Sequence, residues 1–268
     1  MGSRLVTASL LIPVSLCPFL EPTGVSVLAL AFVVGAVCSS EMSQLVAPGK
    51  GWFPWLGALL GVACGWAGFH PYAPSPILVG CLLVACLIGV ANMMQRGRSA
   101  SLQASSLWVF APTYAIFLVH RMTLIELQPH WSYLRPAALC FVPIWAGDIA
   151  ALVVGRLIGR HRLSPTISPN KTVEGALANL LCCVGVAGWV GVHVGVPLPV
   201  ALICGVLAGV LGQAGDLFES WVKRQVGAKD SGALLPGHGG LLDRVDSMLF
   251  AAAPIALVLA IWLSTNGG

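Results

Sequence analysis

The sequence predicts an all-α fold, that of a polytopic integral membrane protein with about nine transmembrane helices. Three observations support this class. Of the 268 residues, 57% are hydrophobic and only 9% are charged, whereas charged residues make up about a quarter of an ordinary soluble domain. The mean hydropathy is +0.88. Apolar runs of about twenty residues, the length that crosses the hydrocarbon core of a bilayer, recur along the whole chain.

Nine apolar segments are candidate spans, because a helix satisfies its own backbone hydrogen bonds in lipid. The predicted spans cover residues 5–20, 24–45, 52–68, 76–93, 104–119, 134–154, 175–194, 200–222 and 243–263. The first follows Arg4 and is similar to the apolar part of a signal peptide. No convincing cleavage site follows it, and the next apolar run begins at Gly24, so we interpret it as a span.

The distribution of lysine and arginine agrees with nine spans. Basic residues gather in cytoplasmic loops. With nine spans, the N-terminus and the loops after spans two, four, six and eight lie on one side. That side carries twelve basic residues, namely Arg4, Lys50, Arg96, Arg98, Arg156, Arg160, Arg162, Lys171, Lys223, Arg224, Lys229 and Arg244. The other side carries only Arg121 and Arg135, so we expect a cytoplasmic N-terminus and an external C-terminus.

Three aspartates flank the loop between the last two predicted spans. Asp216 lies late in the eighth span, and Asp243 and Asp246 open the ninth. Residues three or four apart share a helix face, so Asp216, Ser220 and Lys223 form one stripe. We expect the three carboxylates to converge on a hard cation such as Mg²⁺, which takes carboxylate and phosphate oxygens. The alternative is structural: ion pairs with a neighbour such as Arg244, or helix capping by Asp243.

The loop itself, residues 227–240, contains five glycines. Glycine lets a backbone fold closely and present N–H groups to an anion. The cations that would hold phosphate groups here are Lys223, Arg224, Lys229 and Arg244. His238 is a candidate general acid; alternatively it satisfies local hydrogen bonds.

A second polar segment, ISPNKTVEG at residues 167–175, precedes the seventh span. Ser168-Pro169 is a candidate helix start, since proline is tolerated in a first turn. Lys171 and Thr172 then lie near a helix N-terminus, which favours anions. The triplet NKT is similar to the end of a Walker A loop, but the glycine spacing of that motif is absent.

Asp148 stands alone inside the sixth predicted span, in the run WAGDIAA. An acid within a membrane span is a candidate functional residue by default. The alternative is an ion pair with a neighbour such as Arg156.

The run S-W-V-K-R-x4-K-D-S-G-x3-P-G-H-G-G-x2-D-R-x-D resembles the signature of the phosphatidate cytidylyltransferases, also called CDP-diacylglycerol synthases. The matching positions are Ser220, Lys223, Arg224, Lys229, Asp230, Ser231, Gly232, Pro236, Gly237, His238, Gly239, Gly240, Asp243, Arg244 and Asp246. Upstream, the pattern S-P-x-K-T-x-E-G from Ser168 to Gly175 resembles a second family segment, and Asp148 a third. The resemblance extends less specifically to Glu41 and its neighbours.

The resemblance implies a nucleotidyltransferase of phospholipid synthesis that transfers CMP from CTP to phosphatidic acid. The products are CDP-diacylglycerol and pyrophosphate, formed at the cytoplasmic face of the cell's inner (plasma) membrane. The implied cofactor is Mg²⁺, with a second cation such as K⁺ beside it. The implied partners are membrane lipids and a second copy of the chain, with no nucleic acid. The lipid phosphate is already anionic, so such catalysis is mostly positioning and charge neutralisation.

The resemblance also implies roles for individual residues. The implied catalytic residues are Lys223, Arg224, Lys229, Asp230, His238 and Arg244. The implied substrate-binding residues are Ser168, Lys171, Thr172, Glu174, Ser220, Gly239, Gly240 and Asp148. The implied metal ligands are Asp216, Asp243 and Asp246. Residues 131–268 then form the catalytic transmembrane region, and residues 1–130 form N-terminal helices that act as a scaffold, a lipid-facing surface or a dimer interface.

Three other functions remain as alternatives. A CDP-alcohol phosphotransferase also uses aspartates to hold a metal, but its pattern separates the last two by three residues, whereas two separate Asp243 and Asp246. A CTP-dependent polyprenol or phytol kinase would release CDP rather than pyrophosphate. A transporter could use Asp148 and Asp216 as a cation path, but it gives no reason for the cationic glycine-rich loop.

Overall fold

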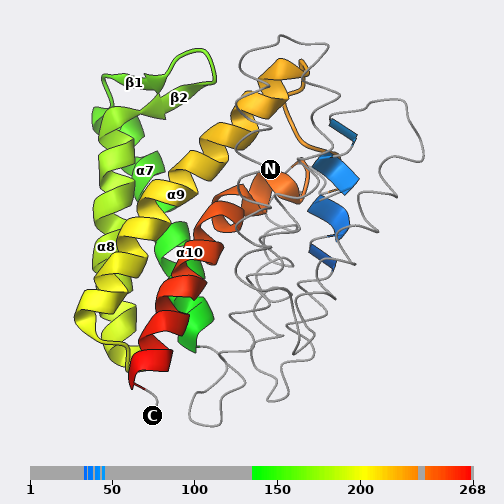
Figure 1. Ribbon diagram of the computed structural model, residues 1–268. Coiled ribbons are helices and arrows are strands. Elements are labelled where there is room, and N and C mark those ends of the chain that lie inside the picture. The colour runs from blue at the N-terminus through cyan, green and yellow to red at the C-terminus, as the bar shows by residue number, and fades with distance from the viewer. Residues whose placement is uncertain are drawn as a thin grey trace. The chain divides into compact units, whose positions relative to one another are not determined.

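The computed structural model describes residues 33–34, 36–38, 40–42, 44–45, 135–234 and 239–266. Its elements are mostly helical and follow the order α7 (Arg135–Ile158), β1 (Arg162–Ser164), β2 (Ser168–Thr172), α8 (Val173–Val194), α9 (Leu198–Gln225) and α10 (Leu242–Asn266) (Figure 1). The described positions between 33 and 45, which belong to the second predicted span, are also helical. Predicted spans one, three, four and five lie outside the described residues.

The chain divides into two compact units. One comprises residues 125–222 and 246–268, and the other comprises residues 1–124 and 223–245. The charge-rich loop therefore belongs to the same unit as the N-terminal part of the chain. The predicted functional division near residue 130 stays a prediction.

Four helical segments are long and apolar enough to cross a membrane: Ala138–Ile158, Val173–Val194, Leu198–Gln225 and Leu242–Leu263. They correspond to the last four predicted spans, so the prediction of a mostly helical chain with long apolar helices is confirmed for the described residues. Pro143 in α7 and Pro254 in α10 lie inside these helices, as is common in transmembrane segments. The count of nine spans stays a prediction.

A two-stranded antiparallel hairpin joins α7 to α8, and the all-α prediction missed it. Arg162 lies opposite Thr172, and Ser164 lies opposite Ser168. The predicted helix start at Ser168-Pro169 is wrong, because these residues belong to β2. Both serine and threonine are good N-caps, and it is Thr172, directly before the apolar run, that caps α8 by accepting a hydrogen bond from the Gly175 N–H at 3.2 Å.

Small residues let the helices of the unit 125–222 and 246–268 approach closely. A Cβ added at Gly205 of α9 would lie 2.7 Å from the Cα of Val184 in α8. A Cβ added at Gly147 of α7 would lie 2.5 Å from the Sγ of Cys183 in α8. Glycine at such seams is typical of helix packing in membranes, where close backbone contact replaces the hydrophobic effect.

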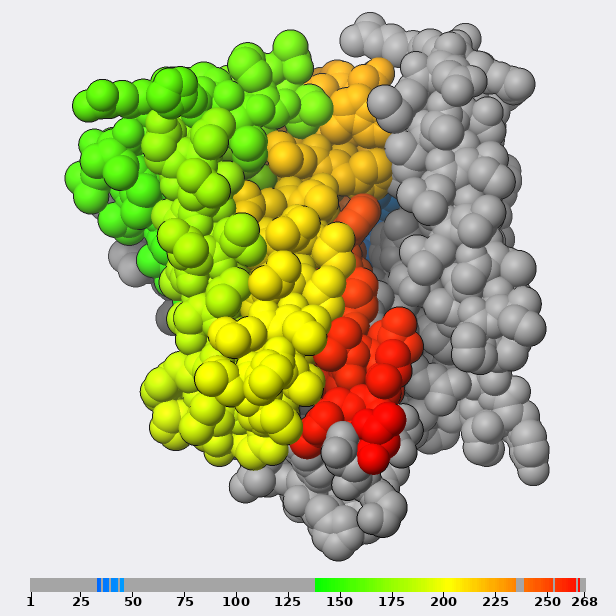
Figure 2. Space-filling model, turned by 60° about the vertical axis from the view of Figure 1, so that its left-hand side comes forward, coloured from blue at the N-terminus to red at the C-terminus, as the bar shows by residue number. Residues whose placement is uncertain are grey.

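Large apolar side chains cover the outer surface of α7 and α8. Leu157, Leu177, Leu181 and Trp189 are all more than half exposed, and Figure 2 looks onto the side of this unit formed by α8 and α9. A helix that turns so much apolar surface outward is suited to lipid. This arrangement leaves the polar side chains of the same helices facing one another.

The ends of α8 and α9 are set by local sequence. α8 ends before Gly195, which adopts the left-handed conformation (φ 78°) and donates its N–H to carbonyls of the last turn. α9 continues three residues beyond the predicted end of the eighth span, to Gln225. Lys223 and Arg224 therefore lie in its last turn, where cations are favoured by the helix dipole.

Candidate active site

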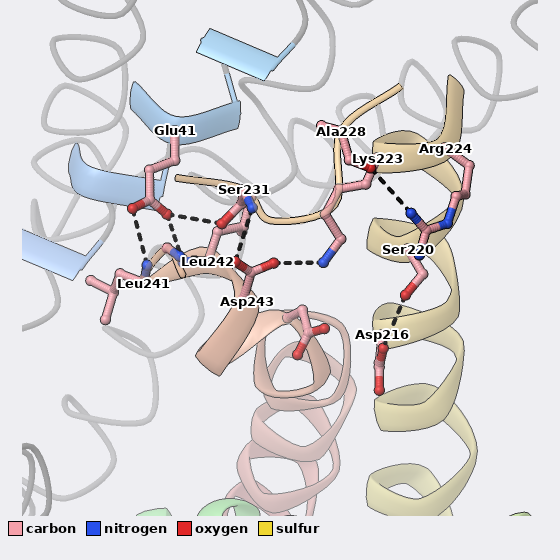
Figure 3. A network of polar contacts seen from close by, with 12 residues as sticks. Glu41, Asp216, Ser220, Lys223, Arg224, Ala228, Ser231, Leu241, Leu242 and Asp243 are labelled. Atoms are coloured by element: carbon pink, nitrogen blue, oxygen red, sulfur yellow. Dashed lines mark hydrogen bonds and ion pairs between the residues drawn. The ribbon is translucent and has the colours of Figure 1, made fainter. Parts of the chain in front are cut away.

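Asp243, in the first turn of α10, accepts hydrogen bonds from three donors, of which Figure 3 labels Lys223 and Ser231. Lys223 Nζ lies 2.5 Å from Oδ1, and the N–H groups of Ser231 and Gly240 each donate to Oδ2 at 2.9 Å. The side chains of Lys223 and Asp243 are only 11% and 8% exposed. A buried carboxylate needs such compensation. The structure thus pairs Asp243 with Lys223, not with Arg244.

The glycine-rich loop closes around the Asp243 carboxylate. Gly239 has a φ of 81°, a backbone conformation that residues other than glycine rarely adopt. A Cβ there would lie 2.7 Å from Asp243 Oδ2, and a Cβ at Gly240 would lie 2.0 Å from Ser231 Oγ. The amides of Ser231 and Gly240 are bonded to a carboxylate in this structure, and phosphate binding by loop amides stays a prediction.

Glu41 contacts the same loop from a helical segment of the same unit. Its side chain is buried (5% exposed). The N–H of Leu241 donates to Oε1 at 3.0 Å, and the N–H of Leu242 donates to Oε2 at 2.8 Å. Ser231 Oγ also donates to Oε2, at 3.3 Å (Figure 3). Glu41 therefore accepts the amide that directly precedes α10 and the first amide of α10, in the position of a helix cap supplied from far along the chain.

In the other unit, Lys171 of β2 forms an ion pair with Asp216 of α9. The two side chains are 27% and 35% exposed, so water still reaches this pair. Ser220, one turn further along α9, donates to Asp216 Oδ1 at 3.4 Å, as the four-residue spacing predicts. The pair ties the β-hairpin to α9.

Asp148 belongs to a polar network inside the same unit. Asn179 Nδ2 of α8 donates to Asp148 Oδ1 at 3.2 Å, and Gln213 Nε2 of α9 donates to Asn179 Oδ1 at 3.2 Å. The network joins α7, α8 and α9. The sequence offered Arg156 as an alternative partner, whereas the structure pairs Asp148 with Asn179.

Asp246 lies one turn after Asp243 on α10. Its Oδ1 accepts the N–H of Ser247 at 2.7 Å, and the buried carboxyl of Glu219 in α9 lies beside it. The charges of Asp216 and Lys171 act on both Asp246 and Asp148. Among these groups, Lys171 and Asp216 form a direct ion pair.

The remaining predicted site residues have varied surroundings. Glu174, in the first turn of α8, accepts from His161 Nδ1 at 2.6 Å and so holds the start of the hairpin. Ser168 opens β2, and Thr172 caps α8. The exposed members are Arg224, Lys229, Asp230 and Arg244. His238 lies outside the described residues, together with Pro236 and Gly237.

The three predicted metal ligands have suitable chemistry, since Mg²⁺ prefers carboxylate oxygens. Among the residues that the structure describes, no group of three or more His, Cys, Asp or Glu side chains lies close enough to hold one metal ion. Asp216 and Asp243 each carry a lysine partner instead. The metal assignment stays a prediction.

Comparison with known proteins decides the family. The profile described as the cytidylyltransferase family matches residues 2–262. The chain belongs to this family. The resemblance drawn from the loop signature is thereby confirmed, and it is favoured over a CDP-alcohol phosphotransferase, a CTP-dependent kinase or a transporter.

Curated relatives carry a more specific name. The phosphatidate cytidylyltransferase of Brucella suis is 39% identical over 191 residues, which are 69% of this chain and 66% of the relative. That of Staphylococcus saprophyticus is 45% identical over 121 residues (44% and 46%), and that of Staphylococcus epidermidis is 42% identical over 130 residues (47% and 49%). The matches thus span just under two thirds of the Brucella relative and about half of the Staphylococcus relatives.

Several residues of these networks were not predicted as site residues. They are Glu41, Asn179, Gln213 and His161. Glu41 is an acid within a predicted span, and Asn179 and Gln213 are amides within apolar runs. Polar groups in a span need partners. The presence of these polar residues in apolar runs therefore indicated buried hydrogen bonds, but the sequence does not say which partner each group finds.

Proposed function

We propose that the protein transfers CMP from CTP to phosphatidic acid and forms CDP-diacylglycerol and pyrophosphate in phospholipid synthesis. The observation that carries this proposal is the family match over residues 2–262. The relatives named phosphatidate cytidylyltransferase support the choice of acceptor. The intact loop signature from Ser220 to Asp246 supports it further.

In this reaction a phosphate oxygen of phosphatidic acid attacks the α-phosphorus of CTP. A new P–O bond forms, the bond from the α-phosphorus to the oxygen that bridges to the β-phosphate breaks, and pyrophosphate leaves with that electron pair. The nucleophile is anionic, so no strong base is required. The protein contributes by holding two anionic substrates together and offsetting their charge.

Cations of the chain offset that charge. Those assigned to the triphosphate and the lipid headgroup are Lys223, Arg224, Lys229 and Arg244, and those assigned to either phosphate are Ser168 and Lys171. The exposure of Arg224, Lys229 and Arg244 supports this role, because charged side chains at the surface are accessible to a substrate. Lys171 and Lys223 are fixed by Asp216 and Asp243, so their ammonium groups are already oriented.

Magnesium is assigned to Asp216, Asp243 and Asp246, with a second cation such as K⁺ beside it. Asp243 and Asp246 lie three residues apart on α10 and share a helix face. Asp216 acts electrostatically on Asp246. When bound, the metal would neutralise phosphate charge on CTP.

The membrane arrangement belongs to the same proposal: nine spans in the inner (plasma) membrane, a reaction at the cytoplasmic face, and a homodimer. The twelve-to-two distribution of basic residues supports the orientation. Both charge-rich loops lie on the basic side under this count. The four long apolar helices support the membrane location.

The test is direct. The purified protein in detergent is incubated with cytidine-labelled CTP, phosphatidic acid and Mg²⁺, and the label is followed into lipid while pyrophosphate is measured. We expect equal amounts of labelled lipid and pyrophosphate, no reaction with diacylglycerol, and none after chelation of the metal. Release of CDP with phosphorylation of an acceptor would refute the proposal in favour of a kinase.

A further inference from the structure

Glu41 has a place in the structure that the proposed reaction does not yet use. It lies in the N-terminal part of the chain, about 200 residues before its partners Leu241 and Leu242. The two consecutive amides meet two different carboxylate oxygens (Figure 3). Leu241 directly precedes α10 and Leu242 opens it, so their N–H groups have no partner within the helix.

This position requires a carboxylate. Each oxygen accepts a backbone amide, and Oε2 also accepts the Ser231 hydroxyl at 3.3 Å. A glutamine has one acceptor oxygen, and its NH₂ group would face an N–H donor. A donor left without a partner in a buried place is costly, and Glu41 is 5% exposed.

Glu41 also explains two glycines of the loop. A Cβ added at Gly232 would lie 2.9 Å from Glu41 Oε1, and a Cβ added at Gly240 would lie 2.6 Å from Oε2. The Glu41 carboxylate therefore leaves no room for a side chain at either position. Glycine at positions 232 and 240 is thus needed for the loop to pack against Glu41.

Ser231 connects this contact to the candidate active site. Its hydroxyl donates to Glu41, and its N–H donates to Asp243 at 2.9 Å. Asp243 in turn holds Lys223. Glu41 thus holds both the loop, through Ser231, and the start of α10, through Leu241 and Leu242. Asp243 lies in the first turn of α10 and accepts the Ser231 N–H, so the loop and the helix start together orient its carboxylate.

We propose that Glu41 is a positioning residue: it orients Asp243 and Lys223 by holding the loop and the first turn of α10. This inference rests on the proposed function only in that Asp243 and Lys223 serve the reaction. Glu41 itself touches no substrate in this assignment.

The first experiment measures CMP transfer by the full chain and its variants. For Glu41→Gln we expect kcat to fall about ten- to hundredfold, with the KM for CTP changed less than about threefold. Glu41→Asp keeps the charge but shortens the reach, so its kcat should lie between those of wild type and Glu41→Gln. The control is Met42→Leu, a buried neighbour of similar volume, whose kinetics should match wild type.

The second experiment does not depend on activity. Hydrogen exchange of the same proteins should show faster exchange in Glu41→Gln for residues 231–243, and unchanged exchange in α8. If the wild type transfers no CMP, the proposed function fails, while the exchange pattern still decides the role of Glu41.

Two outcomes would overturn the inference: a folded Glu41→Gln with wild-type kcat, or one with loop exchange equal to wild type. If both Glu41 variants fail to fold, Ser231→Ala decides, because it removes only the hydroxyl link. A reduced kcat with normal KM in that variant supports the inference, and an unchanged kcat refutes it.

Discussion

The ion pair between Lys223 and Asp243 makes a sharp prediction about stability. In Lys223→Ala, the Asp243 carboxylate would keep its two amide donors but lose its cation in a place where only 8% of its surface is exposed. Removing one partner of a buried ion pair costs about 3–5 kcal/mol, and the remaining amides favour the lower end. For a chain of this size, about 3 kcal/mol corresponds to a fall in Tm of about 5–10 °C.

The assay is thermal unfolding in detergent, followed by the fluorescence of the nine tryptophans. The matched control is Lys229→Ala, since that exposed lysine should change stability by no more than about 0.5 kcal/mol. The double variant Lys223→Met with Asp243→Asn removes both charges, so it should recover most of the lost Tm. A Tm of Lys223→Ala equal to that of Lys229→Ala, or additive losses in the double variant, would refute the reasoning.

Three further predictions concern other parts of the chain. Asp246→Asn should abolish CMP transfer in detergent while the protein stays folded; full turnover with normal magnesium dependence would remove Asp246 from the metal site. Thr172→Val should lower the free energy of unfolding by about 1 kcal/mol, because the Gly175 amide loses its cap, and chemical denaturation against a Thr172→Ser control measures this. Gly205→Ala should cost about 1–3 kcal/mol, because the new Cβ meets the backbone of Val184; wild-type stability of that variant would contradict the close packing of α8 and α9.

Apolar run lengths were sufficient to predict the four long helices, but not their ends. α8 begins at Val173 because Thr172 caps it, whereas the sequence equally allowed Ser168 as a cap. α7 continues to Ile158, past Arg156, because a long arginine can keep its charge in water while its stem covers apolar surface. The hairpin between them is too short for any periodic pattern to predict.

The loop signature predicted a set of site residues, and that set stays a prediction; the sequence did not say which of these residues pair. Sequence spacing places Asp216 and Ser220 on one helix face, and this local relation is present. The partners of Asp243 and Asp148 depend on which helices face each other, and the structure selects Lys223 and Asn179 where the sequence suggested Arg244 and Arg156. These pairings depend on tertiary contacts between helices, so no local sequence pattern predicts them.

The connection between α7 and α8 has a mechanical consequence. The hairpin is fastened at two places, by Lys171 to α9 and by His161 to the first turn of α8. Because of these two contacts, we expect a shift or tilt of α9 to move β2 as well. A spin label or fluorophore at exposed Arg162 would report such movements of the hairpin without a probe inside the helix bundle.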